Sequence, residues 1–179
     1  MGDALTWPMR RLLLVLLLGF SSCLVVPVRE HAPGLATRQR VVTFYETLEP
    51  YGAWIEADTY RVWRPYRHVV GPRFVPYVTG GSWVYSRVGW TFETGWEWGW
   101  LPFHYGRWFE HDLHGWVWLP DTAWAPAWVE WRYGGGYVGW VPLSPSFFVA
   151  APRHWCFVPS RHFVHPRAWE QQVRPAQQA

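Results

Sequence analysis

The sequence predicts an all-β fold, a small twisted antiparallel β-meander or partly open barrel with an aromatic-rich core. From Tyr51 onward, Gly and Pro separate short aromatic segments, a spacing that suits strands and turns. Large residues alternate within several of these segments, as in Trp116-Val117-Trp118, so that Trp116 and Trp118 share one strand face. No segment after the N-terminal apolar run carries an amphipathic helical stripe.

The N-terminus has the pattern of a secretory signal peptide. Arg10 and Arg11 precede an apolar run from Leu12 to Phe20, and small residues follow it. The run spans nine residues, whereas a membrane-spanning helix needs about 20. A buried core helix is the alternative, which the Arg pair directly before the run disfavours. We therefore expect residues 1–22 to be a signal peptide and the protein to be exported.

The segment Phe20-Ser21-Ser22-Cys23 resembles a bacterial lipobox, although Leu is usual in place of Phe20 and Gly or Ala in place of Ser22. The resemblance implies that Cys23 is the first mature residue and carries lipid. Stable anchoring takes more than one acyl chain, which a di- or tri-acylated cysteine provides. Ordinary cleavage near Ser22, giving a soluble exported protein, is the alternative. Leu24 after the cysteine resembles outer-membrane sorting, so we expect an anchor at the outer membrane or the periplasmic face.

The domain organisation follows from composition. Residues 23–43 contain Pro and Gly without a clear period, which indicates a lipid-anchored tether. Residues 44–146 form the Trp-rich β domain, and residues 147–179 an extension that ends in a disordered tail. The chain has seventeen Trp, too many for a small core to bury in full. We expect some indoles to stack in the core and the others to form a surface that binds a partner.

Individual elements can be placed within this domain. Residues 44–48 predict one helical turn, ended by Pro50 and Gly52. The pattern Trp-x-Pro occurs five times and predicts short strands that end at Pro, which cannot donate to a ladder. Residues 105–110 and 115–119 predict one hairpin, residues 127–133 and 137–141 another, and residues 155–159 a further strand. Residues 162–169 predict a short helix or an extended tail.

Alternation also predicts which side chains share a strand face. Trp96, Trp98 and Trp100 are spaced to lie on one face of one strand. In the next segment, Tyr105, Arg107 and Phe109 are expected on the face opposite Trp108.

Longer motifs carry a family resemblance. They read YGAW, YRVWRPY, GSWVYS, GWTFETGWEWGWLPFHYGRW, GWVWLPDTAWAPAWVEWR and GGGYVGWVPLSP. This order resembles a Trp-rich bacterial envelope domain of unknown function that sometimes stands beside FecR-like domains. The resemblance covers about residues 44–145, with Phe103 where Tyr is usual and Asp121 where Gly is usual. It implies an envelope location and a common fold, and it brings no activity with it.

No motif points to an enzyme, a metal site or a cofactor. The chain has no nucleophile elbow, phosphate loop or zinc-protease motif. Glu93 and Glu97 on one strand face would lie about 13 Å apart, too far for a glycosidase pair. The loop from His111 to His114 and a looser group with His154, Cys156, His162 and His165 lack structural zinc spacing. Cys156 itself is expected to be a small buried thiol.

The net charge and the aromatic residues limit the classes of partner that the protein is expected to bind. The net charge is +3, all sixteen basic residues are Arg, and no polybasic run suggests nucleic acid. Arg107 and Arg132 follow the pattern of cation–π staples with Trp108 and Trp131, or of a mixed binding face. The candidate binding residues are Trp98, Trp100, His104, Tyr105, Arg107, Trp108, Trp128, Trp131 and Arg132. His104 is expected to be a packed histidine bonded to a backbone carbonyl.

These observations favour a non-enzymatic envelope lipoprotein, attached to the membrane by its lipid, that acts as a structural or protein-interaction module. The alternative is a module that binds glycan strands such as peptidoglycan through exposed Trp and Arg. Coplanar Trp on one open face would favour glycan binding, whereas Trp used up in the core beside a separate apolar patch would favour protein partners. A buried His–carboxylate pair at a pocket would favour an enzyme.

Overall fold

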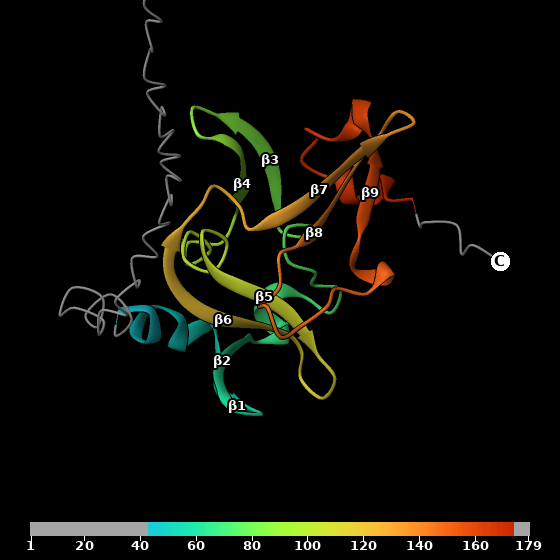
Figure 1. Cartoon of the computed structure of the whole chain (residues 1–179). Coiled ribbons are helices and arrows are strands. Elements are labelled where there is room, and N and C mark those ends of the chain that lie inside the picture. The colour runs from blue at the N-terminus through green and yellow to red at the C-terminus, as the bar shows by residue number, and fades with distance from the viewer. Residues whose placement is uncertain (1–42, 174–179) are drawn as a thin grey trace, which may run out of the picture. The chain divides into compact units, whose positions relative to one another are not determined.

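The computed structural model describes residues 43–173, which form open antiparallel sheets (Figure 1). The core that these sheets enclose is rich in aromatic side chains. This confirms the all-β prediction, and the sheets stay open instead of closing into a barrel. The predicted signal peptide, Cys23, nearly all of the tether and residues 174–179 lie outside the described residues. Within residues 43–173, no helix has the length and apolar character needed to cross a membrane.

The strands are short, and turns or single helical turns connect them. The strands are Gly52–Ala57 (β1), Tyr60–Pro65 (β2), Gly81–Ser86 (β3), Gly89–Thr94 (β4), Tyr105–His111 (β5), Gly115–Trp124 (β6), Val129–Gly134 (β7), Tyr137–Pro142 (β8) and Cys156–Pro159 (β9). The short helices are Glu49–Tyr51 (η1), Arg67–Val70 (α2), Pro152–His154 (η2), Ser160–His162 (η3) and Ala168–Gln171 (η4). The predicted helical turn is confirmed at residues 43–48, and residues 162–169 are mainly turns.

Four hairpins supply most of the pairing, but they do not form one continuous meander. The sheets have the strand orders β1-β2-β6-β5, β3-β4 and β7-β8-β9. Both predicted hairpins are confirmed, as β5–β6 and β7–β8. The second one turns at Gly135 and Gly136, which have φ values of +57° and +82° that glycine adopts at little cost. Because β2 pairs with β6, the first sheet joins segments far apart in the sequence.

A row of four tryptophans crosses the first sheet. Trp54 is the Cα partner of Trp63, Trp63 of Trp118, and Trp118 of Trp108. The indole N–H of Trp63 donates to Leu48 O at 3.0 Å, and that of Trp118 donates to Tyr105 O at 2.7 Å. Cross-strand neighbours on one face are the units that stabilise a sheet. The aromatic core is therefore built on this row.

The two faces of the first sheet bury different side chains. On β6, Trp116 and Trp118 face the main aromatic cluster, whereas Val117 and Leu119 face a smaller cluster that also holds Phe109. The prediction that Trp116 and Trp118 lie on the same face of one strand is thus confirmed. Alternation with period 2 sorts indoles to one face and smaller apolar side chains to the other.

The segment around Trp98 corrects one prediction. Residues 95–104 are turns, so Trp96, Trp98 and Trp100 do not share a strand face. Backbone bonds from Gly99 N to Trp96 O at 2.9 Å and from Leu101 N to Trp98 O at 3.2 Å curl the chain. Gly95, Gly99 and Pro102 make that curl favourable, and sequence alternation cannot reveal it. For the same reason Glu93 and Glu97 do not lie on one strand, and Glu97 instead accepts a hydrogen bond from the Tyr51 hydroxyl.

The Trp-x-Pro pattern ends strands at some of its sites only. Pro65 ends β2, Pro142 ends β8, and β6 ends at Trp124, two residues before Pro126. Pro120 instead lies inside β6, and the Trp100–Pro102 copy lies in turns. Pro lies inside a strand mainly at edges and bulges, and β6 does have an irregular register with β5 near Pro120.

The segment after residue 146 packs into the same core as far as it is described. Strand β9 pairs with β8, which confirms the strand expected at residues 155–159. Phe163 packs against Trp140, with ring centroids 5.6 Å apart. Cys156 is buried, as expected, and burial raises the pKa of its thiol to about 12, so the thiol stays protonated at neutral pH.

Candidate functional site

A large irregular bulge in β6, opposite Gly106 of β5, shapes the candidate site. Tyr105 pairs with Trp124 and Arg107 with Leu119, so Gly106 alone lies opposite residues 120–123 of β6. Gly106 has a φ of +63°, and a Cβ there would lie 2.3 Å from Leu119 O. Only glycine fits this close approach of two backbones.

The bulge also corrects the predicted alternation on β5. Tyr105 packs against the main cluster, which contains Trp108, and its ring centroid lies 5.4 Å from that of Phe44. Phe109 lies in the smaller cluster instead. The prediction that Tyr105 and Phe109 share a face is therefore wrong, because the register shift at Gly106 interrupts the period of 2.

The side chain of Asp121 binds backbone N–H groups within the bulge of β6. Its Oδ1 accepts hydrogen bonds from the backbone N–H of Thr122 at 2.6 Å and of Ala123 at 3.3 Å. The carboxylate is exposed, and its charge acts on the guanidinium of Arg107. Bulges of this kind re-aim side chains beside functional sites.

His104 ties the segment before β5 to the segment after β6. Its carbonyl accepts the backbone N–H of Ala125 at 2.9 Å and the indole N–H of Trp128 at 3.1 Å. Its Nδ1 lies 3.1 Å from Ala125 O, so Nδ1 carries the proton and donates. This confirms the expected bond to a backbone carbonyl.

Burial sets the protonation state of His104. Burial lowers the pKa of its imidazole, while hydrogen bonds to the carbonyls of Ala125 and Pro126 act in the opposite direction. Since the net pKa is below the usual value of about 6.5, the ring is neutral at pH 7. The neutral ring stacks on Trp124, with centroids 5.8 Å apart and planes at 27°.

Arg107 lies over the indole of Trp128. The guanidinium carbon is 3.3 Å from the ring centroid, and Nη1 donates to Gly106 O at 3.0 Å. Burial lowers the pKa of Arg107, whereas the charge of Asp121 raises it. The cation–π prediction is right for the Arg but wrong for the partner, because the neighbouring Trp108 points into the core.

Arg132 also stacks on a tryptophan other than the one predicted. Its guanidinium carbon lies 4.0 Å from the ring centroid of Trp155, not over its neighbour Trp131. Trp131 packs against Trp83, with ring centroids 4.6 Å apart. Neighbours in a strand point to opposite faces, so an Arg finds its aromatic partner on another strand or loop.

Two half-exposed indoles border this region. Trp124 is 49% exposed and Trp100 is 46% exposed. Tyr105 connects them, because it pairs with Trp124 across the strands and its ring lies 6.4 Å from that of Trp100 at an interplanar angle of 85°. We call this surface the aromatic face; it comprises Trp100, His104, Tyr105, Arg107, Asp121, Trp124 and Trp128.

The aromatic face brings together five of the nine candidate binding residues. Trp98 and Trp108 are buried core residues, so neither can present a ring to a partner. Trp131 and Arg132 belong to β7, in a different sheet. Sequence reasoning missed Trp124 and Asp121 as site residues, although the Trp-x-Pro pattern marked the first and the departure from the family pattern marked the second.

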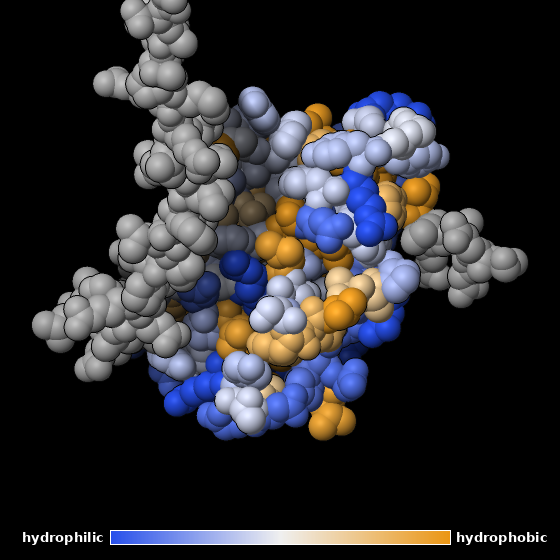
Figure 2. Space-filling model, viewed as in Figure 1, coloured by the Kyte–Doolittle hydropathy of each residue, from blue (hydrophilic) through white to orange (hydrophobic). Residues whose placement is uncertain are grey.

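The described surface also carries two grooves. One, of about 340 Å³, is lined by Arg132, Tyr133, Gly134, Tyr137, Phe157 and Val173. We call it the tyrosine groove, because Tyr133 and Tyr137 are 65% and 42% exposed. The other, of about 440 Å³, lies beside β3 and β4 and is lined by Glu93, Thr94 and several glycines. On the face in Figure 2, apolar residues occur in groups bordered by hydrophilic ones.

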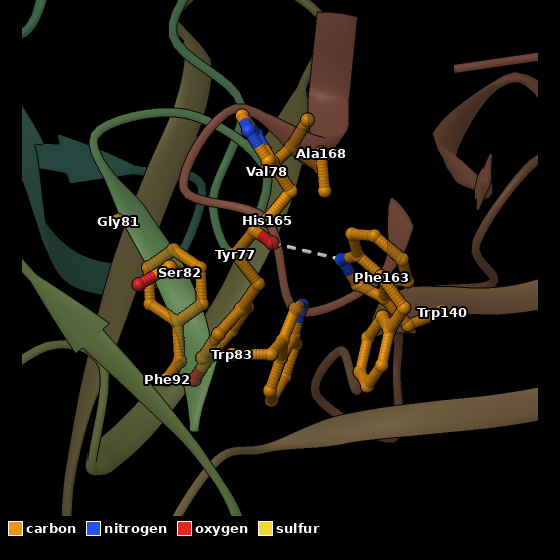
Figure 3. Close-up of a pocket in the computed structure, with 10 residues that line it drawn as sticks. All are labelled: Tyr77, Val78, Gly81, Ser82, Trp83, Phe92, Trp140, Phe163, His165 and Ala168. Atoms are coloured by element: carbon orange, nitrogen blue, oxygen red, sulfur yellow. Dashed lines mark hydrogen bonds between the residues drawn. The ribbon is translucent and has the colours of Figure 1, made fainter. Parts of the chain in front are cut away.

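A small internal cavity lies where the sheets meet. Its volume is about 10 Å³, and Figure 3 shows Trp83, Phe92, Trp140 and Phe163 around it. The indole N–H of Trp140 donates to Tyr77 O at 2.8 Å across this space. Among the described residues, the buried indole N–H groups of Trp54 and Trp83 have no acceptor. The cavity holds about one water molecule at most and is too small for a ligand.

A buried histidine and a partly exposed carboxylate join η2 to β5. His154 is 5% exposed, and its Nε2 lies 2.7 Å from Glu110 Oε2. Its Nδ1 accepts the backbone N–H of Ala151 at 3.0 Å, so Nε2 carries the proton and donates. Arg153 donates to the same oxygen from Nε at 3.2 Å and from Nη2 at 3.0 Å. Neither His154 nor Glu110 lines any of the three cavities above.

Changing Glu110 to Gln is expected to lower the unfolding free energy at pH 7 by about 1 kcal/mol, a value that allows for solvent screening of this partly exposed group. Burial would raise the pKa of Glu110, but hydrogen bonds from His154 and Arg153 lower it below its usual value. Its contribution is therefore present above the unfolded pKa of about 4.3 and is lost as the pH falls through the folded pKa. Urea unfolding at pH 7 and pH 3 measures both effects.

The matched control for this prediction is Glu93→Gln, which removes an exposed carboxylate on β4. It is expected to change stability little at either pH. An E110Q deficit of the same size at pH 3 and pH 7 would show that the loss is not due to the carboxylate charge.

The loop histidines of β5–β6 contact each other. The rings of His111 and His114 stack with centroids 4.8 Å apart, and His111 Nε2 lies 3.6 Å from Asp58 Oδ2. Within residues 43–173, no group of three His, Cys, Asp or Glu side chains is arranged to hold a metal ion.

Comparison with known proteins gives a family and no activity. No curated protein and no solved structure matches the chain. A family model described as a family of unknown function (DUF6600) matches residues 45–147, which include the Trp row, the bulge and the whole aromatic face. The chain therefore belongs to the DUF6600 family.

Proposed function

We propose that this protein is a non-enzymatic lipoprotein of the bacterial cell envelope, exported by its N-terminal segment and anchored through Cys23. Its domain acts as a structural or protein-interaction module. The Arg pair, the short apolar run and the lipobox-like segment support the export and anchoring steps.

The distribution of aromatic side chains carries the interaction role. The buried indoles are Trp63, Trp83, Trp98, Trp108, Trp118, Trp140 and Trp155. Six further Trp are partly buried and pack against the core, so most of the Trp content stabilises the fold. None of these indoles lines the tyrosine groove, which has the exposed rings of Tyr133 and Tyr137 in its wall. Tyr is enriched at protein interfaces, where its ring is buried and its hydroxyl finds a hydrogen-bond partner.

The arrangement of titratable groups supports a non-enzymatic role. The His154–Glu110 pair resembles a catalytic dyad in distance, but Arg153 binds the same carboxylate oxygen and both histidine nitrogens are engaged. A general base needs a free lone pair within reach of a substrate. The pair therefore acts as a clamp between η2 and β5.

Two readouts in cells test this proposal. Metabolic labelling with an alkyne fatty acid should mark the wild-type protein and not Cys23→Ser, which should also leave the membrane fraction. A photo-crosslinking amino acid at Tyr137 should give a discrete adduct with an envelope protein. The same amino acid at Tyr85, which is exposed on the β3–β4 hairpin, is the control.

Unlabelled wild-type protein would refute the anchor. A Tyr137 pattern identical to that of Tyr85 would refute the interaction surface. The two parts of the proposal therefore fail separately.

The aromatic face favours a second function, the binding of glycan strands. It offers two half-exposed indoles beside a guanidinium, a carboxylate and a neutral imidazole. Carbohydrates present apolar C–H faces together with hydroxyl groups, so they suit a surface that mixes rings with polar groups. This second function uses a different surface from the tyrosine groove.

A further inference from the structure

We infer that the aromatic face is a binding site for an uncharged glycan chain, with sugar rings stacking on Trp124 and Trp100. The inference deepens the second function proposed above and depends on export of the protein. It depends neither on acylation of Cys23 nor on a protein partner at the tyrosine groove.

The stacking surface follows from the way Trp124 is held. His104 covers one face of the indole, with ring centroids 5.8 Å apart and planes at 27°. Trp124 is still 49% exposed, so about half of the residue stays open to a ligand. A flat aromatic face backed by a second ring is a suitable platform for the C–H face of a pyranose.

A second platform lies next to the first. The ring of Trp100 meets that of Tyr105 nearly at right angles, and Tyr105 is the strand partner of Trp124. Tyr105 therefore links the two half-exposed indoles at the open end of the β5–β6 hairpin, by a ring contact with Trp100 and by strand pairing with Trp124. Platforms in such a row contact successive rings of a chain, which favours an oligosaccharide over a single sugar.

The electrostatics of the face fit an uncharged ligand. The face has one cation, Arg107, on which the negative charge of Asp121 acts, and His104 is neutral at pH 7, so the opposite charges offset one another. A polyanion gains its affinity from an excess of cations, which this face lacks. The guanidinium donates and the carboxylate accepts hydrogen bonds, and these complement the hydroxyl and acetamido groups of an N-acetylhexosamine.

The face is also pre-formed. The His104 carbonyl holds both Ala125 and the Trp128 indole, and the backbone N–H of Trp128 donates to the buried Tyr77 hydroxyl at 3.3 Å. Arg107 is stacked on Trp128 before any ligand arrives. Binding then orders few side chains, which raises the affinity a small contact area can reach.

The test uses the full-length protein purified in a detergent without a sugar headgroup and titrated with a hexasaccharide of N-acetylglucosamine. Calorimetry and intrinsic fluorescence should both show saturable binding. Trp124→Ala should weaken it at least tenfold, Trp100→Ala by a smaller factor, and Asp121→Asn should weaken it without removing a ring. Tyr85→Ala removes an exposed aromatic residue from the β3–β4 hairpin and should bind as the wild type does.

The variants change exposed side chains, and a cooperative thermal unfolding transition well above the assay temperature confirms that each one is folded. Three results would overturn the inference: no saturable binding by the wild type, Trp124→Ala binding as tightly as the wild type, or tighter binding of heparin than of the neutral hexasaccharide. None of these results affects fatty-acid labelling at Cys23 or crosslinking at Tyr137, so this inference can fail while the proposed interaction module stands.

Discussion

Replacing Trp118 by alanine is expected to lower the unfolding free energy by about 4–5 kcal/mol, at the upper end for loss of a buried indole. Trp118 is fully buried and lies inside the Trp row, between Trp63 and Trp108. The change opens a cavity at the junction of three strands. It also removes the donor to Tyr105 O, which is 2.7 Å away, and leaves that carbonyl without its partner. Urea unfolding followed by far-UV circular dichroism measures the loss.

Trp118→Phe separates the two contributions, because it keeps a ring and removes the indole N–H. We expect it to cost about 2 kcal/mol, between the wild type and alanine. Trp124→Ala is the matched control, a Trp on the same strand that is half-exposed, and should cost less than about 1 kcal/mol. Equal losses for Trp118→Ala and Trp124→Ala would contradict the core built on the Trp row.

Gly106→Ala is expected to destabilise the protein by about 3 kcal/mol, the sum of two costs. The φ of +63° lies in the left-handed region, which costs a non-glycine residue about 1–2 kcal/mol. The new Cβ would also lie 2.3 Å from Leu119 O and 2.6 Å from the indole nitrogen of Trp118, and relief of such overpacking costs about 1–3 kcal/mol. Thermal and urea unfolding report the sum.

Gly115→Ala isolates the conformational cost. Gly115 turns the same hairpin with a φ of +68°, and a Cβ there would meet nothing within 4 Å. It should lose only about 1 kcal/mol. If the two glycine variants lose the same free energy, the close approach at the bulge is not a source of instability.

Gly106 also links the fold to the aromatic face. The bulge that it permits includes Asp121, whose charge acts on Arg107, and it adjoins Tyr105, whose ring contacts that of Trp100. A Gly106→Ala protein that still folds in dilute buffer should therefore lose glycan affinity as well as stability. Gly115→Ala should keep that affinity, because its turn lies at the other end of the hairpin.

Local patterns in the sequence were sufficient to predict the fold class and the β5–β6 and β7–β8 hairpins. Alternation placed Trp116 and Trp118 on one face, and Gly135 with Gly136 marked the β7–β8 turn. These features depend on neighbours in the chain, and strand period and turn chemistry are local properties. The same reasoning failed at residues 95–104, where closely spaced Gly and Pro allow turns that alternation does not distinguish from a strand.

Long-range packing decided which side chains of the aromatic face are exposed and which partners they contact. The sequence alone does not distinguish Trp98 from Trp124, yet the first indole is buried and the second is half-exposed. Arg107 selects Trp128, a residue 21 positions away, because the bulge brings it there. Residue spacing predicts where a side chain lies on its own strand. Its burial and its partner depend on which strands pair, and that depends on contacts between distant segments.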